Sequence, residues 1–106
     1  MKPITLNECS IKLIVMPEWE VDPEDCFDDV DTVRQVKQDR QSSLWAWCTT
    51  KVSVEWNGAV GESNWLGCCS YENEDEFKND LYYKEMLQRA LKDLNTKVAK
   101  LQRSER

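Results

Sequence analysis

Five cysteines are the residues of this 106-residue chain best suited to nucleophilic, redox or metal chemistry. They are Cys9, Cys26, Cys48, Cys68 and Cys69. Their odd number and the absence of any C-x-x-C pair fit neither a disulfide framework nor a zinc site. Because free cysteine commonly packs as a small hydrophobic side chain, the spacing predicts reduced, partly buried thiols and no bound metal.

Other catalytic groups are scarce. The chain has no histidine, which removes the commonest general base and the commonest zinc ligand. It has only three glycines, no phosphate-binding glycine loop and no nucleophile elbow. A pair of carboxylates remains as a catalytic option, but no spacing selects one pair. The sequence therefore predicts a protein that is not an enzyme and needs no cofactor.

Acidic side chains are concentrated between residues 18 and 31, where no basic residue occurs. They are Glu18, Glu20, Asp22, Glu24, Asp25, Asp28, Asp29 and Asp31. Such a run is most often a solvated helix face. It can instead imitate a nucleic-acid backbone in front of a basic groove on another protein. A calcium site is a third interpretation, but the D-x-D-x-D-G pattern is missing. The net charge of −6 disfavours direct binding of nucleic acid.

A tryptophan pair offers a second candidate for partner binding. Trp45 and Trp47 fall on the same strand face as the polar residues Lys51, Ser53 and Glu55, so they are either core or an exposed anchor for a partner. Two arrangements would bury these tryptophans: a β-bulge that moves the following side chains to the other face of the strand, or a sheet that is covered on both faces at this end.

The acidic segment and the tryptophans lie on or beside strands and helices that the hydrophobic pattern of the sequence predicts. Residues 10–16 alternate as a strand that ends at Pro17. Asp22 and Pro23 form a helix start, and the apolar spacing that follows predicts one helix over residues 23–40. No signal peptide or membrane-length apolar run is recognised, so a cytoplasmic location is expected.

A central hairpin is the strongest local prediction. Residues 44–56 are strand-like, Asn57-Gly58 is typical of a type I′ turn, and residues 59–70 form the returning strand. A two-residue loop sets the register as Trp56 opposite Ala59, Val54 opposite Gly61, and Val52 opposite Ser63.

A long helix is predicted at the C-terminal end, near residues 81–103, after an acidic connector in which Asn73 caps a short turn near Phe77. Its apolar stripe covers the sheet or forms a homodimer seam. The seam residues would be Leu87, Leu91, Leu94, Val98 and Leu101.

The predicted fold class is α+β in a single domain of residues 1–106. It comprises a small antiparallel sheet of about three strands, with the Asn57-Gly58 hairpin at its centre. The helix near residues 23–40 and the long helix near residues 81–103 cover this sheet.

One segment resembles a known family. The pattern comprises W-A-W at residues 45–47, L-G-C-C-S-Y at 66–71, Phe77, Y-Y-x-x-M at 82–86 and A-L-x-D-L at 90–94. It resembles small uncharacterised proteins of bacteriophages and prophages over about half of the chain. Members usually have glycine where this chain has Cys68, so we expect no strict backbone requirement there. The family contributes no catalytic residues.

The resemblance implies a phage accessory protein in the cytoplasm of an infected or lysogenic bacterial cell. With the acidic segment, it favours a protein that binds a basic partner protein, as an anti-CRISPR or anti-restriction inhibitor would. A self-assembling scaffold protein that dimerises through the C-terminal helix is the alternative, and a protein that sequesters a small ligand is another. For the Leu66–Tyr71 motif we favour a structural corner over a functional loop.

Overall fold

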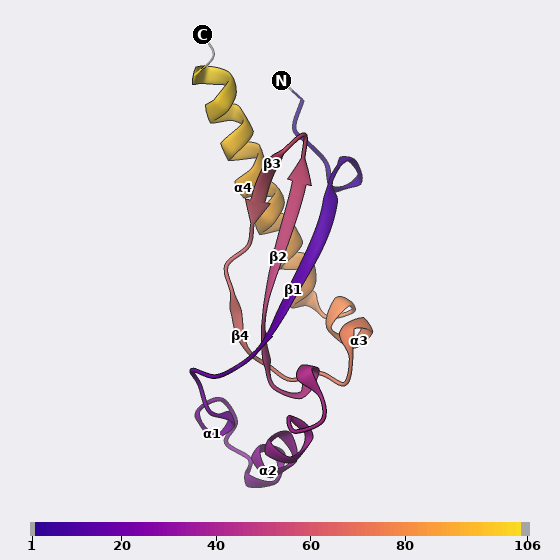
Figure 1. Ribbon diagram of the computed structural model, residues 1–106, viewed down its shortest axis with the longest axis vertical. Coiled ribbons are helices and arrows are strands. Elements are labelled where there is room, and N and C mark those ends of the chain that lie inside the picture. Colours follow the sequence, from indigo (N-terminus) through magenta and orange to yellow (C-terminus); the bar gives the residue numbers. More distant parts are fainter. Residues whose placement is uncertain (1, 105–106) are drawn as a thin grey trace. The chain divides into compact units, whose positions relative to one another are not determined.

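The computed structural model describes residues 2–104, and they form an α+β fold (Figure 1). The strands are β1 (Ser10–Pro17), β2 (Cys48–Trp56), β3 (Ala59–Glu62) and β4 (Leu66–Cys69). The α-helices are α1 (Pro23–Cys26), α2 (Val30–Asp39), α3 (Glu74–Lys78) and α4 (Leu81–Ser104), and two short 3-10 turns occupy Leu6–Glu8 and Leu44–Ala46. The predicted fold class is confirmed, with four strands rather than about three.

The sheet has the order β1-β2-β3, and β4 also pairs with β2. The chain forms two compact units. Unit 1 contains residues 1–14, 51–64 and 81–106, and unit 2 contains residues 15–50 and 65–80.

The central hairpin of unit 1 forms as predicted. Asn57 and Gly58 have φ of 48° and 82°, the left-handed values that a type I′ turn requires. Trp56 lies opposite Ala59 and Val54 opposite Gly61, so the predicted register is confirmed. Two positions further, the Ser63 N–H donates to the Val52 carbonyl at 2.9 Å. The Val52 N–H donates to the Ser63 hydroxyl, also at 2.9 Å.

Helix α4 packs against β3 at very short range, because Gly61 has no side chain. A Cβ built at Gly61 would lie 2.3 Å from the Ala90 carbonyl oxygen and 2.5 Å from the Leu94 nitrogen. Val52, Val54, Ala90 and Leu94 are fully buried in this unit. The apolar stripe of α4 therefore covers the sheet, which is the first of the two roles that its spacing allows.

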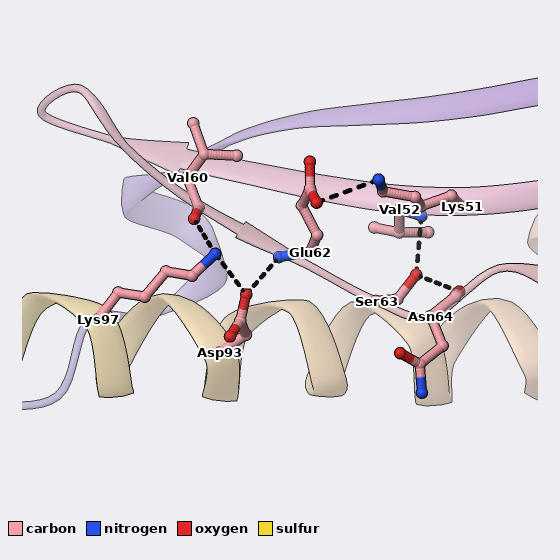
Figure 2. Close-up of polar contacts among 8 residues, drawn as sticks. All are labelled: Lys51, Val52, Val60, Glu62, Ser63, Asn64, Asp93 and Lys97. Atoms are coloured by element: carbon pink, nitrogen blue, oxygen red, sulfur yellow. Dashed lines mark hydrogen bonds and ion pairs between the residues drawn. The ribbon is translucent and has the colours of Figure 1, made fainter.

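Polar contacts flank this packing (Figure 2). The Asp93 carboxylate accepts the Glu62 N–H at 2.9 Å and pairs with Lys97 at 2.9 Å. The hydrogen bond from the Glu62 N–H, followed by that from Lys97, lowers the pKa of Asp93. Lys97 also donates to the Val60 carbonyl at 3.1 Å. These bonds join Val60 and Glu62 of β3 to one face of α4.

The N-terminal segment of unit 1 is attached to α4 by a side-chain amide. The Ile4 N–H donates to Asn95 Oδ1 at 2.8 Å, and Asn95 Nδ2 donates to the Ile4 carbonyl at 3.1 Å. Ile4 is 4% exposed. Both main-chain groups of a buried residue are thereby satisfied, as burial requires.

In unit 2, the helix predicted over residues 23–40 is wrong as a single element, because it divides into α1 and α2. Phe27 is extended, with φ −122° and ψ 136°, and its ring packs 5.9 Å from that of Trp47. Asp29 then begins a new helix, since its carboxylate accepts from the Asp31 and Thr32 N–H groups. Packing of Phe27 thus overrides the helical periodicity, and Asp29 restarts it.

The returning strand predicted over residues 59–70 is also divided, into β3 and β4. The register between β4 and β2 is irregular, with Cys48 opposite Cys69 and Thr50 opposite Leu66. Cys68 has φ 59°, a left-handed backbone that favours glycine. The expectation of no strict backbone requirement at this position is therefore wrong.

The prediction of reduced thiols throughout is wrong at two positions. Cys26 and Cys68 form a disulfide with Cα atoms 6.5 Å apart. Cys9, Cys48 and Cys69 are free thiols. The bridge joins residues 42 apart in sequence, and no local spacing indicates it.

The Leu66–Tyr71 motif forms a corner in unit 2, as favoured from the sequence. The Tyr71 N–H donates to the Trp45 carbonyl at 2.7 Å, and the Tyr71 hydroxyl donates to the Asp80 carboxylate at 2.9 Å. The Tyr71 and Phe77 rings pack with centroids 5.1 Å apart. Asn73 caps α3 by accepting the Glu76 N–H at 2.9 Å, which confirms the predicted turn.

Candidate functional site

The segment that follows β1 in unit 2 is attached firmly on both sides of Trp19. The Glu18 N–H donates to the Trp47 carbonyl at 3.3 Å, and Glu18 Oε1 accepts the Cys68 N–H at 3.2 Å. On the other side, the Trp47 indole N–H donates to the Val21 carbonyl at 3.0 Å. The backbone that carries Trp19 is therefore fixed in place before any partner arrives.

Trp19 itself is 84% exposed, which is rare for so large an apolar side chain. Three further exposed apolar side chains of the same unit line the grooves beside Trp19, namely Met16, Leu44 and Trp65. We call these four residues, with the grooves beside Trp19, the Trp19 surface. Clustered exposed apolar side chains mark interaction sites more often than isolated ones do.

Two grooves flank Trp19, and both are bordered by Pro17 and Glu18. The first has a volume of about 470 Å³ and continues past Met16 and Trp65. The second has a volume of about 510 Å³ and continues past Arg40 and Leu44. A ridge between two grooves can insert into a partner while the grooves accept the partner's own side chains.

Three of the eight acidic side chains have structural partners. The Glu18 carboxylate accepts the Cys68 N–H, as described above, and the Glu20 N–H at 3.4 Å. Glu24 pairs with Lys37, and this hydrogen bond lowers the pKa of Glu24. Asp29 accepts the Thr32 hydroxyl at 2.7 Å as well as the two N–H groups at the start of α2, and these bonds lower its pKa. These three carboxylates are needed for the local fold.

The other five carboxylates are exposed. They are Glu20, Asp22, Asp25, Asp28 and Asp31. Asp31 lies 3.8 Å from Arg34, a loose and exposed pair of little energetic weight. Within residues 2–104, the side chains of Glu20, Asp25 and Asp28 form no hydrogen bond or ion pair. The structure thus separates the acidic segment into carboxylates that hold the fold and carboxylates that are displayed.

The expectation that Trp45 and Trp47 form an exposed pair is wrong. Trp47 is 3% exposed and packs against Phe27, while Trp45 is half-buried, with its ring centroid 5.5 Å from that of Phe77. Trp47 and its neighbour Cys48 are both buried, so this end is covered on both faces, and the register between Cys48 and Thr50 is also irregular.

Sequence reasoning missed Trp19. The signal available was its position between two glutamates directly after the strand-ending Pro17, a polar neighbourhood that disfavours burial.

Most of the residues expected to form a homodimer seam are buried or half-buried within unit 1. Leu94 and Val98 are 0% and 4% exposed. Leu87 and Leu91 are half-buried, and Leu101 is 58% exposed. A two-stranded seam needs all these positions on one open face, so the seam as predicted does not form without unpacking α4.

A further cavity in unit 1, of about 580 Å³, lies between the end of β3 and α4. Asp93 and Glu62 line it, but their carboxylates pair with Lys97 and Lys51 (Figure 2). Arg89 and Lys92 also line it, so the cavity contains charges of both signs.

No group of three or more cysteine, aspartate or glutamate side chains is arranged to hold a metal ion among residues 2–104. The helices of this described part include none that is both long and apolar enough to cross a membrane. Comparison with family models, curated proteins and solved structures finds no match for this chain.

Proposed function

We propose that this protein binds a basic partner protein through the Trp19 surface and the displayed carboxylates beside it. The observation that carries the proposal is an 84% exposed tryptophan on a backbone that is already fixed. Tryptophan is the residue most enriched among binding hot spots. A preorganised anchor binds with less loss of conformational freedom than a mobile one.

The exposed area of Trp19 sets the size of the apolar contribution. A tryptophan side chain buries about 200 Å², so covering the 84% that is exposed yields about 4 kcal/mol at 25 cal/mol/Å². The costs of association reduce this value. A single anchor therefore does not account for tight binding, and the charged neighbours are needed as well.

The displayed carboxylates support a partner that normally binds nucleic acid. Glu20, Asp25 and Asp28 lack partners within residues 2–104, so they remain available to lysine and arginine side chains on another molecule. Negative charge on a protein surface steers a basic partner and raises its rate of association. We therefore propose a phage-type accessory protein that inhibits a host-defence nuclease of the CRISPR or restriction class inside a bacterial cell, without enzymatic activity of its own.

Two alternatives from the sequence have less support. Dimerisation through α4 would need Leu94 and Val98, which are buried within their own unit. Sequestering of a small ligand is compatible with the volumes of the grooves beside Trp19, but no buried, unpaired polar side chain is present in them to orient a ligand.

The test uses charge reversal at positions that the fold does not need. A triple variant, Glu20→Lys, Asp25→Lys and Asp28→Lys, removes displayed carboxylates. Asp29 and Glu24 stay intact, because their loss would disturb α2 and its ion pair with Lys37. The matched control reverses three exposed acids outside the acidic segment, at Glu55, Glu72 and Glu85. Both variants change the net charge equally.

The assay is phage plaquing on bacterial strains that carry an active CRISPR or restriction system against that phage. We expect the wild-type protein and the control variant to restore plaquing, and the triple variant and Trp19→Ala to fail. Melting curves of all four purified proteins check that they fold. Equal rescue by the triple variant would contradict the role of the acidic segment, and absence of rescue by the wild type would contradict the proposed function.

A further inference from the structure

Cys48 and Cys69 are two free thiols that face each other across a strand pair in unit 2. They are register partners of the antiparallel strands β2 and β4. They are 0% and 3% exposed, so both thiols are buried within the unit. The function proposed above uses neither of them.

Their position opposite each other in the strand pair is compatible with a disulfide. Directly opposed residues on antiparallel strands have Cα atoms about 4.5 or 5.5 Å apart, depending on the hydrogen-bonding pattern. Both separations lie inside the range of about 4.4–6.8 Å that disulfides span. The neighbouring residue, Cys68, is already bridged to Cys26.

We propose that Cys48 and Cys69 are a redox modification site, at which a small disulfide oxidant such as glutathione disulfide forms a second intrachain disulfide. The Cys69 thiolate attacks one sulfur of the oxidant and releases the first thiol. Cys48 then loses its proton and attacks the Cys69 sulfur of the mixed disulfide, which releases the second thiol. The two protein thiols are oxidised, and the oxidant disulfide is reduced to two thiols that take up the two protons.

The surroundings assign Cys69 as the first nucleophile. The interaction with Cys48 lowers the pKa of Cys69, and the same interaction raises the pKa of Cys48. The Thr50 hydroxyl lies 3.5 Å from the Cys69 sulfur and acts in the same direction. A thiol with the lower pKa is the better attacking group near neutral pH.

Access to Cys69 requires β4 to open. β4 has four residues and an irregular register with β2, so it is the short strand that opens locally at lower cost than the whole sheet. The new bond would keep β4 on β2. It would also hold Cys68, whose N–H binds Glu18 next to Trp19.

The experiment uses the folded full chain with Cys9→Ser, which removes the remaining free thiol. The folded protein is incubated with glutathione disulfide. The incubation time is the time in which the thiols of the same chain, unfolded in urea, react completely with this oxidant. We expect an intact mass lower by two hydrogen atoms, no retained glutathione, and a proteolytic fragment in which Cys48 is linked to Cys69. The Cys48–Cys69 disulfide closes a loop of the chain and should therefore raise the melting temperature by roughly 10 °C.

Two single variants test the order of the steps. With Cys48→Ser added, Cys69 should retain one glutathione as a mixed disulfide. With Cys69→Ser added, Cys48 should stay unmodified over the same time. The proposal is overturned if both thiols remain free in the folded Cys9→Ser chain, if each carries its own glutathione, or if Cys69 links to Cys26 or Cys68 instead. These outcomes are independent of the plaquing assay, so they distinguish this proposal from the proposed function.

Discussion

Replacing Gly61 by alanine should destabilise unit 1 strongly, because no space exists between β3 and α4 at this position. The added Cβ would lie 2.3 Å from the Ala90 carbonyl oxygen, 2.5 Å from the Leu94 nitrogen and 2.6 Å from the Leu94 Cβ. None of these atoms can rotate away, so α4 must move by about 1 Å to regain ordinary contact.

The magnitude follows from the two opposing effects. Overpacking costs about 1–3 kcal/mol, and the upper part of that range applies where main-chain atoms must shift. Replacing glycine with alanine returns about 0.4–1 kcal/mol through the unfolded state. We expect a net loss of about 2 kcal/mol, or a fall of roughly 10 °C in Tm for a chain of this size.

The assay is urea unfolding followed by circular dichroism, with Gly67→Ala as the matched control. At Gly67 the nearest atom to an added Cβ is the Glu18 carboxylate oxygen, 2.8 Å away at the end of a flexible side chain. The control should therefore lose less stability than Gly61→Ala. An unfolding midpoint for Gly61→Ala equal to that of the wild type, or above that of Gly67→Ala, would refute the close contact between β3 and α4.

Substitutions at Asp29 and Asn95, each with a matched variant, test how the chain fixes its local structure. Asp29→Ala should lower Tm by a few degrees while Asp28→Ala leaves it unchanged, because Asp29 caps α2 and Asp28 has no partner within residues 2–104. Since the hydrogen bonds of Asp29 lower its pKa, its contribution to stability is present above the pKa of an unfolded aspartate and is lost as the pH falls below about 4. The fall of Tm with decreasing pH should therefore be less steep in Asp29→Ala than in the wild type. Equal slopes of Tm against pH would contradict this. Asn95→Ala should cost about 1–3 kcal/mol by releasing Ile4 and the Leu91 carbonyl. Asn95→Asp keeps only the acceptor for the Ile4 N–H, so hydrogen exchange at Ile4 should stay slower in it than in Asn95→Ala, and equal exchange rates would exclude the proposed attachment.

The proposed function and the redox proposal involve different residues of unit 2. Binding depends on Trp19 and the displayed carboxylates, and oxidation depends on Cys48 and Cys69. Glu18 connects them, because its carboxylate accepts the N–H of Cys68, the residue next to Cys69. A plaquing assay on the Cys69→Ser variant would therefore measure whether the second disulfide matters for partner binding.

The hairpin and the long helix were predictable because their causes are local. The turn at Asn57-Gly58 needs two residues that tolerate positive φ, and a two-residue turn sets the register of the strands beside it. The stripe of α4 repeats every three or four residues, so it is visible within a short window of sequence. The cap of α3 by Asn73 is local in the same way.

The candidate site depended on contacts between residues far apart in the sequence. Local periodicity over residues 23–40 is helical, yet the packing of Phe27 on Trp47 breaks it. Trp19 stands between two glutamates and Trp47 between Ala46 and Cys48, and these neighbours favour exposure of the first and burial of the second without fixing either. Their burial is decided by a fold that brings Glu18 to Cys68 and Val21 to Trp47.

The sequence by itself determined the α+β class, the hairpin register, the extent of the C-terminal helix and the acidic character of residues 18–31. The tertiary structure alone decided which tryptophan is exposed, which carboxylates are displayed, and which cysteines meet. The physical reason is range: turn and helix preferences act over about four residues, whereas burial and thiol pairing follow from contacts such as Cys26 with Cys68, 42 residues apart.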